Sequence, residues 1–567
     1  MGSELKKRQF LILAAIVGIF IFYVLTLFSM ADGFIIQKIE DVFHRVLRDP
    51  ARWIDVIQHT ALLSLFALLN VYFLFYVRYG VMIRGALAEK IKINKQTLCC
   101  KETFKFFIFT ALFLFFAYFN VITAHFFYAD DVFRNYGGNR SWIGFSRYVS
   151  EFGSILIHNN IKLNDVAPLS QFIAIVVSSA TVMVLSFSLT KQVSLKNCIA
   201  LSAIFTAPCY VECFSYRFDS PYMAFSLFFA AIPFLFFDDK KVFLYVSVVC
   251  LLLTCISYQA ALPLYILAAI YLFAKDFVQY GDLKKSFKSA IWAAVAFAIA
   301  LVVFKLFFMN KMEQGPDDYF SSKIDFSAFF SNITEYLKIT FHFHGGLFSK
   351  VLFILSMLYL IVSFVNRASV NKLYAFFLIV LVLVTAHGLS FGPYLLFSRP
   401  VFAPRAFMGF NTFVAFILLA CLNINTNNSK KIPVVITFLS IYSFVVFLFT
   451  YGNCLKNQKE YENFRIQMII SDLAEDVTNT ECLNVCFIGQ VDFCQKNRVA
   501  LNNYPVLSTL ISRRPAGSSS WNDELLGGYN LGCECETKDL TDDFVLKKQT
   551  VYHDIYQNAN DFIVVLK

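Results

Sequence analysis

Asp130 and Asp131 follow a long apolar stretch, within the segment Tyr128–Arg134. A carboxylate at the centre of a bilayer costs about 2.5–3.5 kcal/mol on insertion scales, so the pair is expected at the membrane interface or in a wet cavity. There a carboxylate can accept a proton from an attacking hydroxyl group, and two together can bind a divalent cation such as Mg²⁺ or Mn²⁺. A short helix would bring Arg134 beside the pair, a combination suited to a charged, lipid-linked substrate. The alternative is that the two acids cap the apolar segment and face water.

Three arginines are candidates for binding a phosphate group: Arg134, Arg217 and Arg405. The planar guanidinium group matches phosphate oxygens with two parallel donors. Arg217 shares a short loop with Asp219, with which it could instead form a salt bridge. Arg405 follows Pro404, and an arginine at the end of a helix can also extend to the membrane interface without binding a ligand.

Five residues suit the binding of a sugar or of an acceptor: Trp142, Arg147, Asp219, Tyr258 and Gln259. The face of Trp142 can stack on a sugar ring, although tryptophan is also enriched at membrane interfaces. Gln259 can donate to sugar hydroxyls, or it can tie two helices together.

The composition indicates that the chain is a membrane protein. Of 567 residues, 58% are hydrophobic and 16% are charged, against roughly 25% charged in soluble proteins. The mean hydropathy is +0.61. The net charge of +10 does not indicate a nucleic-acid partner, because the basic residues are spread over short loops in the pattern of membrane topology. The first apolar run is too long for the core of a cleavable signal peptide.

The predicted fold is an all-α polytopic membrane protein with about thirteen spans. The apolar runs lie near residues 9–30, 58–77, 106–127, 171–190, 198–215, 221–237, 242–257, 260–274, 289–309, 351–365, 373–391, 406–423 and 432–451. Lys6, Lys7 and Arg8 favour a cytoplasmic N-terminus, and every second loop after them is basic. This alternation places the candidate residues and the C-terminal segment on the outer face.

A small α/β domain is expected at the C-terminal end. Helical spacing over Glu460–Asp476 puts Phe464, Met468 and Leu473 on one face, and residues 482–489 and 561–566 have the pattern of short buried strands. Five cysteines in this segment favour one or two disulfides over a zinc site. They are Cys482, Cys486, Cys494, Cys533 and Cys535. The predicted domains are a two-span extension with a basic loop (1–105), a transmembrane catalytic core (106–452) and a soluble domain (453–567).

Several short blocks resemble the O-antigen serotype-converting glucosyltransferases, the type II glucosyltransferase family. The blocks are Tyr128–Arg134 with Trp142 and Arg147, Asp165–Leu169, Ser215–Ser220, Ser257–Gln259, and Pro404 with Arg405. The resemblance covers about residues 110–450, and residues 9–77 extend beyond the shorter family members.

The resemblance implies a GT-C-like transferase in the bacterial inner membrane, with its C-terminus in the periplasm. The donor would be undecaprenyl-phosphate glucose, supplied by a polyprenyl-phosphate glucosyltransferase and a flippase as functional partners. The acceptor would be a lipid-linked O-antigen on the periplasmic face. One of Asp130 and Asp131 would take the acceptor proton in an inverting displacement, while Arg217 and Arg405 would bind the donor phosphate. A divalent cation at the aspartate pair is the alternative way to stabilise the charge.

Two other functions are compatible with the sequence. One is a lipid-linked sugar transporter or flippase, which would place its polar groups near the membrane midplane in repeated halves. No internal repeat is evident. The other is a transferase for a different sugar or group.

Overall fold

The computed structural model describes residues 90–91, 94, 96–309, 321–343, 345–424, 431–474, 484–513, 540–559 and 561–567. All of these residues belong to one compact unit, Val81–Lys567. The predicted spans near residues 9–30 and 58–77 lie outside the described residues.

Eight helices of the described residues are long and apolar enough to cross a membrane. They are α5 (Lys101–Thr123), α8 (Leu169–Thr190), α13 (Leu262–Tyr280), α14 (Leu283–Phe307), α16 (Leu347–Arg367), α17 (Lys372–Leu389), α18 (Met408–Ile424) and α19 (Lys431–Ala474). Each predicted run beyond residue 105 coincides with helical structure. The predicted count of thirteen spans is nevertheless not confirmed, because several of these helices are short.

Proline residues account for two of the short helices. The run predicted at 198–215 is divided into α9 (Leu195–Thr206) and α10 (Tyr210–Ser215), with Pro208 between them. Proline has no N–H to donate and disfavours helical backbone in the preceding residue, and Ala207 is indeed extended. Likewise α11 (Ser220–Ala231) passes into the 3-10 helix η3 (Ile232–Phe236), which contains Pro233.

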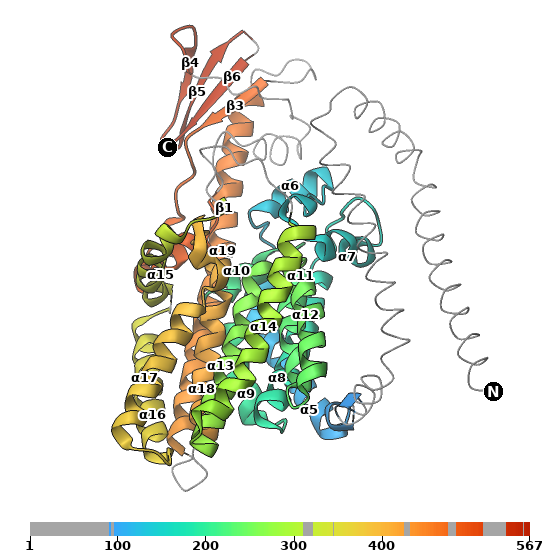
Figure 1. Cartoon of the computed structure of the whole chain (residues 1–567). Helices are drawn as coiled ribbons and strands as arrows, with labels where there is room; N and C mark the ends of the chain where they lie inside the picture. Colours follow the sequence, from blue (N-terminus) through green and yellow to red (C-terminus); the bar gives the residue numbers. More distant parts are fainter. Residues whose placement is uncertain are drawn as a thin grey trace, which may run out of the picture. The chain divides into compact units, whose positions relative to one another are not determined.

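Long helices that follow one another in the chain run in alternating directions (Figure 1). Among the contacting pairs are α8 with α11, α9 with α18, α5 with α19, and α12 (Lys240–Cys255) with α14. Lys191, just after α8, pairs with Asp238 at 2.9 Å, and Lys275 near the end of α13 donates to the carbonyl of Leu189. We call this the basic end of the bundle. The short helices α6 (Asp130–Gly137) and α7 (Tyr148–His158) belong to the opposite end.

Three further short elements of the described residues belong to the bundle. They are α15 (Phe329–Phe343) and the paired strands β1 (Ser321–Ile324) and β2 (Phe397–Arg399). The 3-10 helix η7 (Pro404–Phe407) leads into α18.

Helix α19 lies very close to α5 at Gly452. A Cβ atom at this position would lie 2.6 Å from the backbone carbonyl carbon of Asn120 and 2.8 Å from the nitrogen of Val121. Asn120 also donates its side-chain amide to Asn453 at 3.0 Å. The absence of a side chain therefore lets the two backbones meet.

Helix α19 continues past its apolar part and packs on a four-stranded sheet. The strands are β3 (Asn484–Ile488), β4 (Val545–Gln549), β5 (His553–Asn558) and β6 (Asp561–Leu566). Their order is β3-β6-β5-β4, with β3 parallel to β6 and the other pairs antiparallel. Strands β3 and β6 confirm the two predicted from the apolar pattern. The predicted boundary at residue 452 falls inside a continuous helix.

The predicted buried face of this helix is confirmed at Leu473 but is wrong at Phe464. Phe464 is 44% exposed, whereas Ile466 and Ile469 pack against the sheet together with Leu473. The reason is Arg465, which is fully buried and donates to the backbone carbonyls of Tyr552 and Lys567. The hydrophobic pattern of the sequence predicts only apolar residues on the buried face. It therefore cannot identify Arg465, a cation that is buried because backbone carbonyls bind it.

The cysteine prediction is confirmed in part. Cys486 is disulfide-bonded, but Cys494 is a buried free thiol. Cys482, Cys533 and Cys535 lie outside the described residues.

We expect Gly452→Ala to destabilise the protein, because the new methyl group must push apart two helix backbones. Overpacking of this kind costs about 1–3 kcal/mol. The measurement is the thermal unfolding midpoint of the purified protein in detergent. Gly144→Ala is the matched control, since no atom lies within 4 Å of its added Cβ. Equal midpoints for the two variants would contradict the close packing.

Candidate functional site

The two adjacent aspartates at the start of α6 have different environments. Asp130 is exposed, whereas Asp131 is fully buried. The Asp131 carboxylate accepts hydrogen bonds from the backbone N–H groups of Tyr128 (3.0 Å), Arg217 (2.8 Å) and Phe218 (3.3 Å). Asp131 thus joins the start of α6 to the loop between α10 and α11. Asp130 is left as the carboxylate that solvent or a substrate can reach.

Asp131 is poorly suited to proton transfer or to metal binding. Burial raises the pKa of its carboxyl group, while the three N–H donors act in the opposite direction. Its oxygens accept three hydrogen bonds in a space closed to solvent. Among the described residues, no group of three or more His, Cys, Asp or Glu side chains could hold a metal ion. The predicted two-carboxylate cation site therefore does not fit the residues present.

Arg134 forms a buried ion pair with Asp219 and a cation–π contact with Trp142. We call these three residues the buried framework. The Arg134 Nε lies 3.0 Å from the Asp219 carboxylate, and its guanidinium group lies 4.0 Å above the Trp142 ring. The Trp142 indole N–H donates to the same carboxylate of Asp219. Arg134 therefore pairs with Asp219 instead of lying beside the two aspartates, and it is closed to a donor phosphate. Trp142 is 0% exposed, so a sugar cannot stack on it in this conformation.

A second acid that the sequence did not single out extends this framework. The Glu151 carboxylate accepts from the backbone N–H of Trp142 at 3.0 Å and pairs with Arg140 at 3.2 Å. In the sequence, Glu151 stands out only because it follows Arg147 by four residues. Acid–base pairs at that spacing are common on helix surfaces, so it did not point to Arg140 or Trp142 as partners.

Arg217 is also bound by a carboxylate. Its Nε and Nη2 donate to the two oxygens of Asp165 at 3.3 and 2.5 Å. Its guanidinium group lies over the Phe127 ring, 4.7 Å from the centroid. Only 9% of the Arg217 side chain is exposed. The predicted phosphate-binding position is thus occupied by Asp165, whose role as partner was not predicted.

Arg405, on η7, is the more accessible of the two leading arginines. Its backbone N–H and its Nη1 donate to the Glu212 carboxylate at 2.6 and 2.5 Å. Glu212 is buried, but 24% of the Arg405 side chain remains exposed. The pair thereby neutralises a buried acid within the apolar α10 and presents part of a guanidinium group to the surface.

Arg147, just before α7, differs from these arginines because it forms no ion pair with any described residue. Its guanidinium group lies 4.5 Å from the centroid of the Tyr258 ring and 5.1 Å from that of Phe145. Its Nε is buried without a hydrogen-bond partner in the described part of the chain. Gln259 donates to the carbonyl of Phe145 at 3.2 Å, which holds this loop against the start of α13. Arg147 is therefore a cation with unused donors.

Two buried tyrosines, Tyr216 and Tyr258, lie within electrostatic range of three of these charged groups. The charges of Arg405 and Asp130 both act on the hydroxyl group of Tyr216, and those of Arg147 and Arg405 act on that of Tyr258. Burial raises the pKa of both tyrosines, so their hydroxyls stay protonated and can donate hydrogen bonds. We call Asp130, Arg147, Tyr216, Tyr258 and Arg405 the acid–arginine cluster. It combines one accessible carboxylate with two cations and two donors.

The region of the chain that is similar to known proteins includes all five residues of this cluster. Residues 119–416, more than half of the chain, match the family described as "Glucosyl transferase GtrII". A protein of Salmonella phage P22, described as "Uncharacterized 55.3 kDa protein in gtrB 5'region", is 22% identical over 446 residues. That alignment covers 72% of this chain and 86% of the phage protein. No solved structure matches the chain.

We expect Asp131→Ala to lower the thermal unfolding midpoint, because it leaves three buried N–H donors without their acceptor. Each unsatisfied buried group costs about 1–3 kcal/mol. Asp130→Ala, one residue away on an exposed position, is the matched control and should unfold like the wild type. A wild-type midpoint for Asp131→Ala would show that the buried carboxylate does not stabilise the loop.

Proposed function

Because the chain belongs to the GtrII glucosyltransferase family, we propose that it transfers glucose from undecaprenyl-phosphate glucose to a lipid-linked O-antigen. The reaction takes place at the periplasmic face of the bacterial inner membrane. The observation that carries this proposal is the acid–arginine cluster. Asp130 and Arg405 lie within electrostatic range of Tyr216, Arg405 also lies within range of Tyr258, and Arg147 contacts the Tyr258 ring.

The arginines of the cluster suit a donor whose phosphate lies at the membrane surface. The donor is a phosphodiester with one negative charge, and its prenyl tail stays in the bilayer. Arg405 is already balanced by Glu212, but Arg147 has no carboxylate partner among the described residues. Arg147 therefore supplies the uncompensated positive charge that the phosphate requires.

In the proposed step, the oxygen of an acceptor hydroxyl group attacks the anomeric carbon of glucose. A new glycosidic C–O bond forms as the C–O bond to the phosphate breaks, and the electron pair leaves with undecaprenyl phosphate. Asp130 accepts the hydroxyl proton. Attack from the face opposite the phosphate inverts the anomeric configuration. Arg147 and Arg405 stabilise the charge that develops on the leaving phosphate.

The distribution of basic residues supports a periplasmic cluster. Lys191, Lys240 and Lys275 belong to the basic end, which the cytoplasmic preference of lysine and arginine assigns to the inside. The acid–arginine cluster is at the other end of the same helices. The donor, which is made in the cytoplasm, therefore requires a polyprenyl-phosphate glucosyltransferase and a flippase as functional partners.

We expect Asp130→Asn to lower kcat for glucosyl transfer by about 10²–10⁴-fold, because the amide cannot take the acceptor proton. The assay uses purified protein, undecaprenyl-phosphate glucose and lipid-linked acceptor. Glu335→Gln removes another accessible acid, which pairs with the surface residue Lys338, and should leave the rate unchanged. A wild-type rate for Asp130→Asn would exclude Asp130 as the base.

We expect Arg147→Gln to raise KM for the donor by about tenfold to a hundredfold. This range corresponds to the loss of a charge-assisted hydrogen bond of about 1.5–3 kcal/mol. Arg147→Lys keeps the charge and should recover part of the affinity, although it lacks the planar pair of donors. The result that counts against the proposal is an unchanged KM for the donor in both variants.

A further inference from the structure

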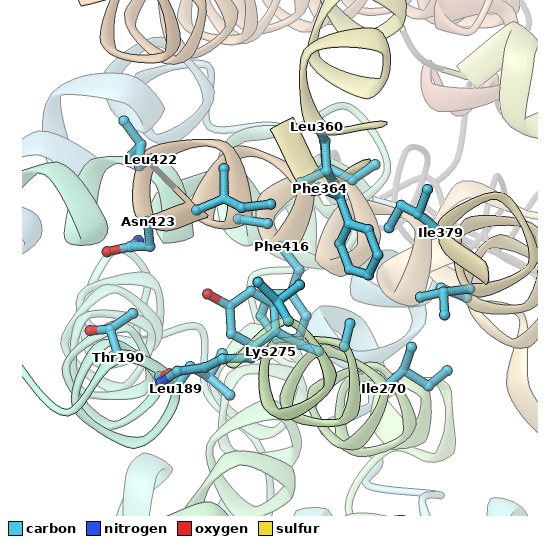
Figure 2. A pocket seen from close by; sticks show the side chains of 18 of the residues that line it. Leu189, Thr190, Ile270, Lys275, Leu360, Phe364, Ile379, Phe416, Leu422 and Asn423 are labelled. Carbon is cyan, nitrogen blue, oxygen red and sulfur yellow. The ribbon is translucent and has the colours of Figure 1, made fainter. Parts of the chain in front are cut away.

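A cavity of about 1050 Å³ lies at the basic end of the bundle. It is bordered by the end of α8 and by long stretches of α13, α16, α17 and α18. Its volume is at the upper limit of the range of about 300–1,000 Å³ that is usual for small-molecule sites. Figure 2 shows side chains from several helices converging on it.

The cavity is separate from the acid–arginine cluster. Helix α8 begins near the cluster, where the Ser170 hydroxyl donates to the carbonyl of Arg217. The last residues of the same helix, Leu189 and Thr190, line the cavity. A helix of 22 residues is about 33 Å long. The proposed glucosyl transfer therefore leaves the cavity unexplained.

Most of the wall is hydrocarbon. Leu360, Phe364 and Ile379 line one side, and Figure 2 shows them across the cavity from Thr190 and Asn423. Along α13 the lining residues extend from Leu267 to Gln279, a distance of about 18 Å at 1.5 Å per residue. This is close to half of the hydrocarbon core of a bilayer, which is about 30 Å thick. The cavity thus has the depth of one leaflet.

The polar part of the lining is cationic. It contains Lys196, Lys275 and Arg367, and the lining residues of the described chain include no carboxylate. Lys275 is held in place by its 2.7 Å hydrogen bond to the carbonyl of Leu189. Neutral polar groups, among them Asn423 and Gln192, lie on the same lining. A ligand that fits both parts combines a hydrocarbon chain with an anionic group.

We infer that this cavity binds an anionic phospholipid of the leaflet at the basic end. One acyl chain lies between α13, α16, α17 and α18, and the phosphate meets Lys196, Lys275 and Arg367. With the basic end in the cytoplasm, this is the leaflet that carries anionic lipids. A polyprenyl carrier fits less well, because its chain is much longer than one leaflet is deep. The bound lipid would join the ends of five helices and so stabilise the bundle.

The test is lipid binding to the purified full-length protein in detergent, measured by native mass spectrometry. Phosphatidylglycerol and phosphatidylcholine with identical acyl chains are the probes. We expect preferential retention of phosphatidylglycerol. Lys275→Gln should weaken its binding by about fivefold, which corresponds to about 1 kcal/mol per basic residue. Lys241→Gln is the matched control, because this exposed lysine belongs to the basic end without lining the cavity.

A second variant tests the apolar part without changing the charge. Ala420 lines the cavity, and Ala420→Trp should fill it and abolish the preference for phosphatidylglycerol. Its thermal midpoint in lipid-free detergent, compared with that of the wild type, shows whether the variant folds. Three results would overturn the inference: equal retention of both lipids by the wild type, wild-type binding by Lys275→Gln, or displacement of phosphatidylglycerol by a smaller amount of undecaprenyl phosphate.

Discussion

The burial of the Asp131 carboxylate is the constraint on which the rest of the site depends. A polar group buried away from water must find hydrogen-bond partners, and here it finds three backbone N–H groups from two separate segments. Those bonds hold the start of α6 against the loop that carries Arg217 and Asp219. Because the loop is fixed, its side chains can meet their own partners on α6 and on the segment before α8. Asp130 remains accessible beside this rigid support.

The same rule separates structural charges from those available to a substrate. Arg134, Arg217 and Arg405 are each paired with a carboxylate, and the first two are almost entirely buried. Breaking such a pair would leave an uncompensated charge in an apolar surrounding, which is strongly destabilising. These arginines therefore stabilise the architecture, although Arg405 also presents part of its side chain to the surface. Arg147 lies against two aromatic rings and pairs with no carboxylate of the described residues, so its charge is available to a ligand.

The two ends of the bundle consequently serve different chemistry. At one end, ionic pairs and two buried tyrosines accompany an accessible acid, and the proposed glucosyl transfer rests on these groups. At the other, lysines and an arginine border a deep apolar cavity that matches one leaflet of lipid. Helices such as α8 and α13 extend from one region to the other, so a lipid that orders the basic end would also steady the helices that support the cluster.

The sequence by itself determined the class of protein and the position of most helices, because hydrophobic runs and alternating basic loops follow directly from the cost of placing polar groups in a bilayer. It also singled out four members of the acid–arginine cluster, namely Asp130, Arg147, Tyr258 and Arg405. Only the tertiary structure decided which aspartate is accessible and which arginine lacks a carboxylate. Ion pairs such as Arg217 with Asp165 join residues far apart in the chain, and local spacing carries no information about such partners. Whether a charged group supports the fold or meets a substrate depends on those partners and on burial.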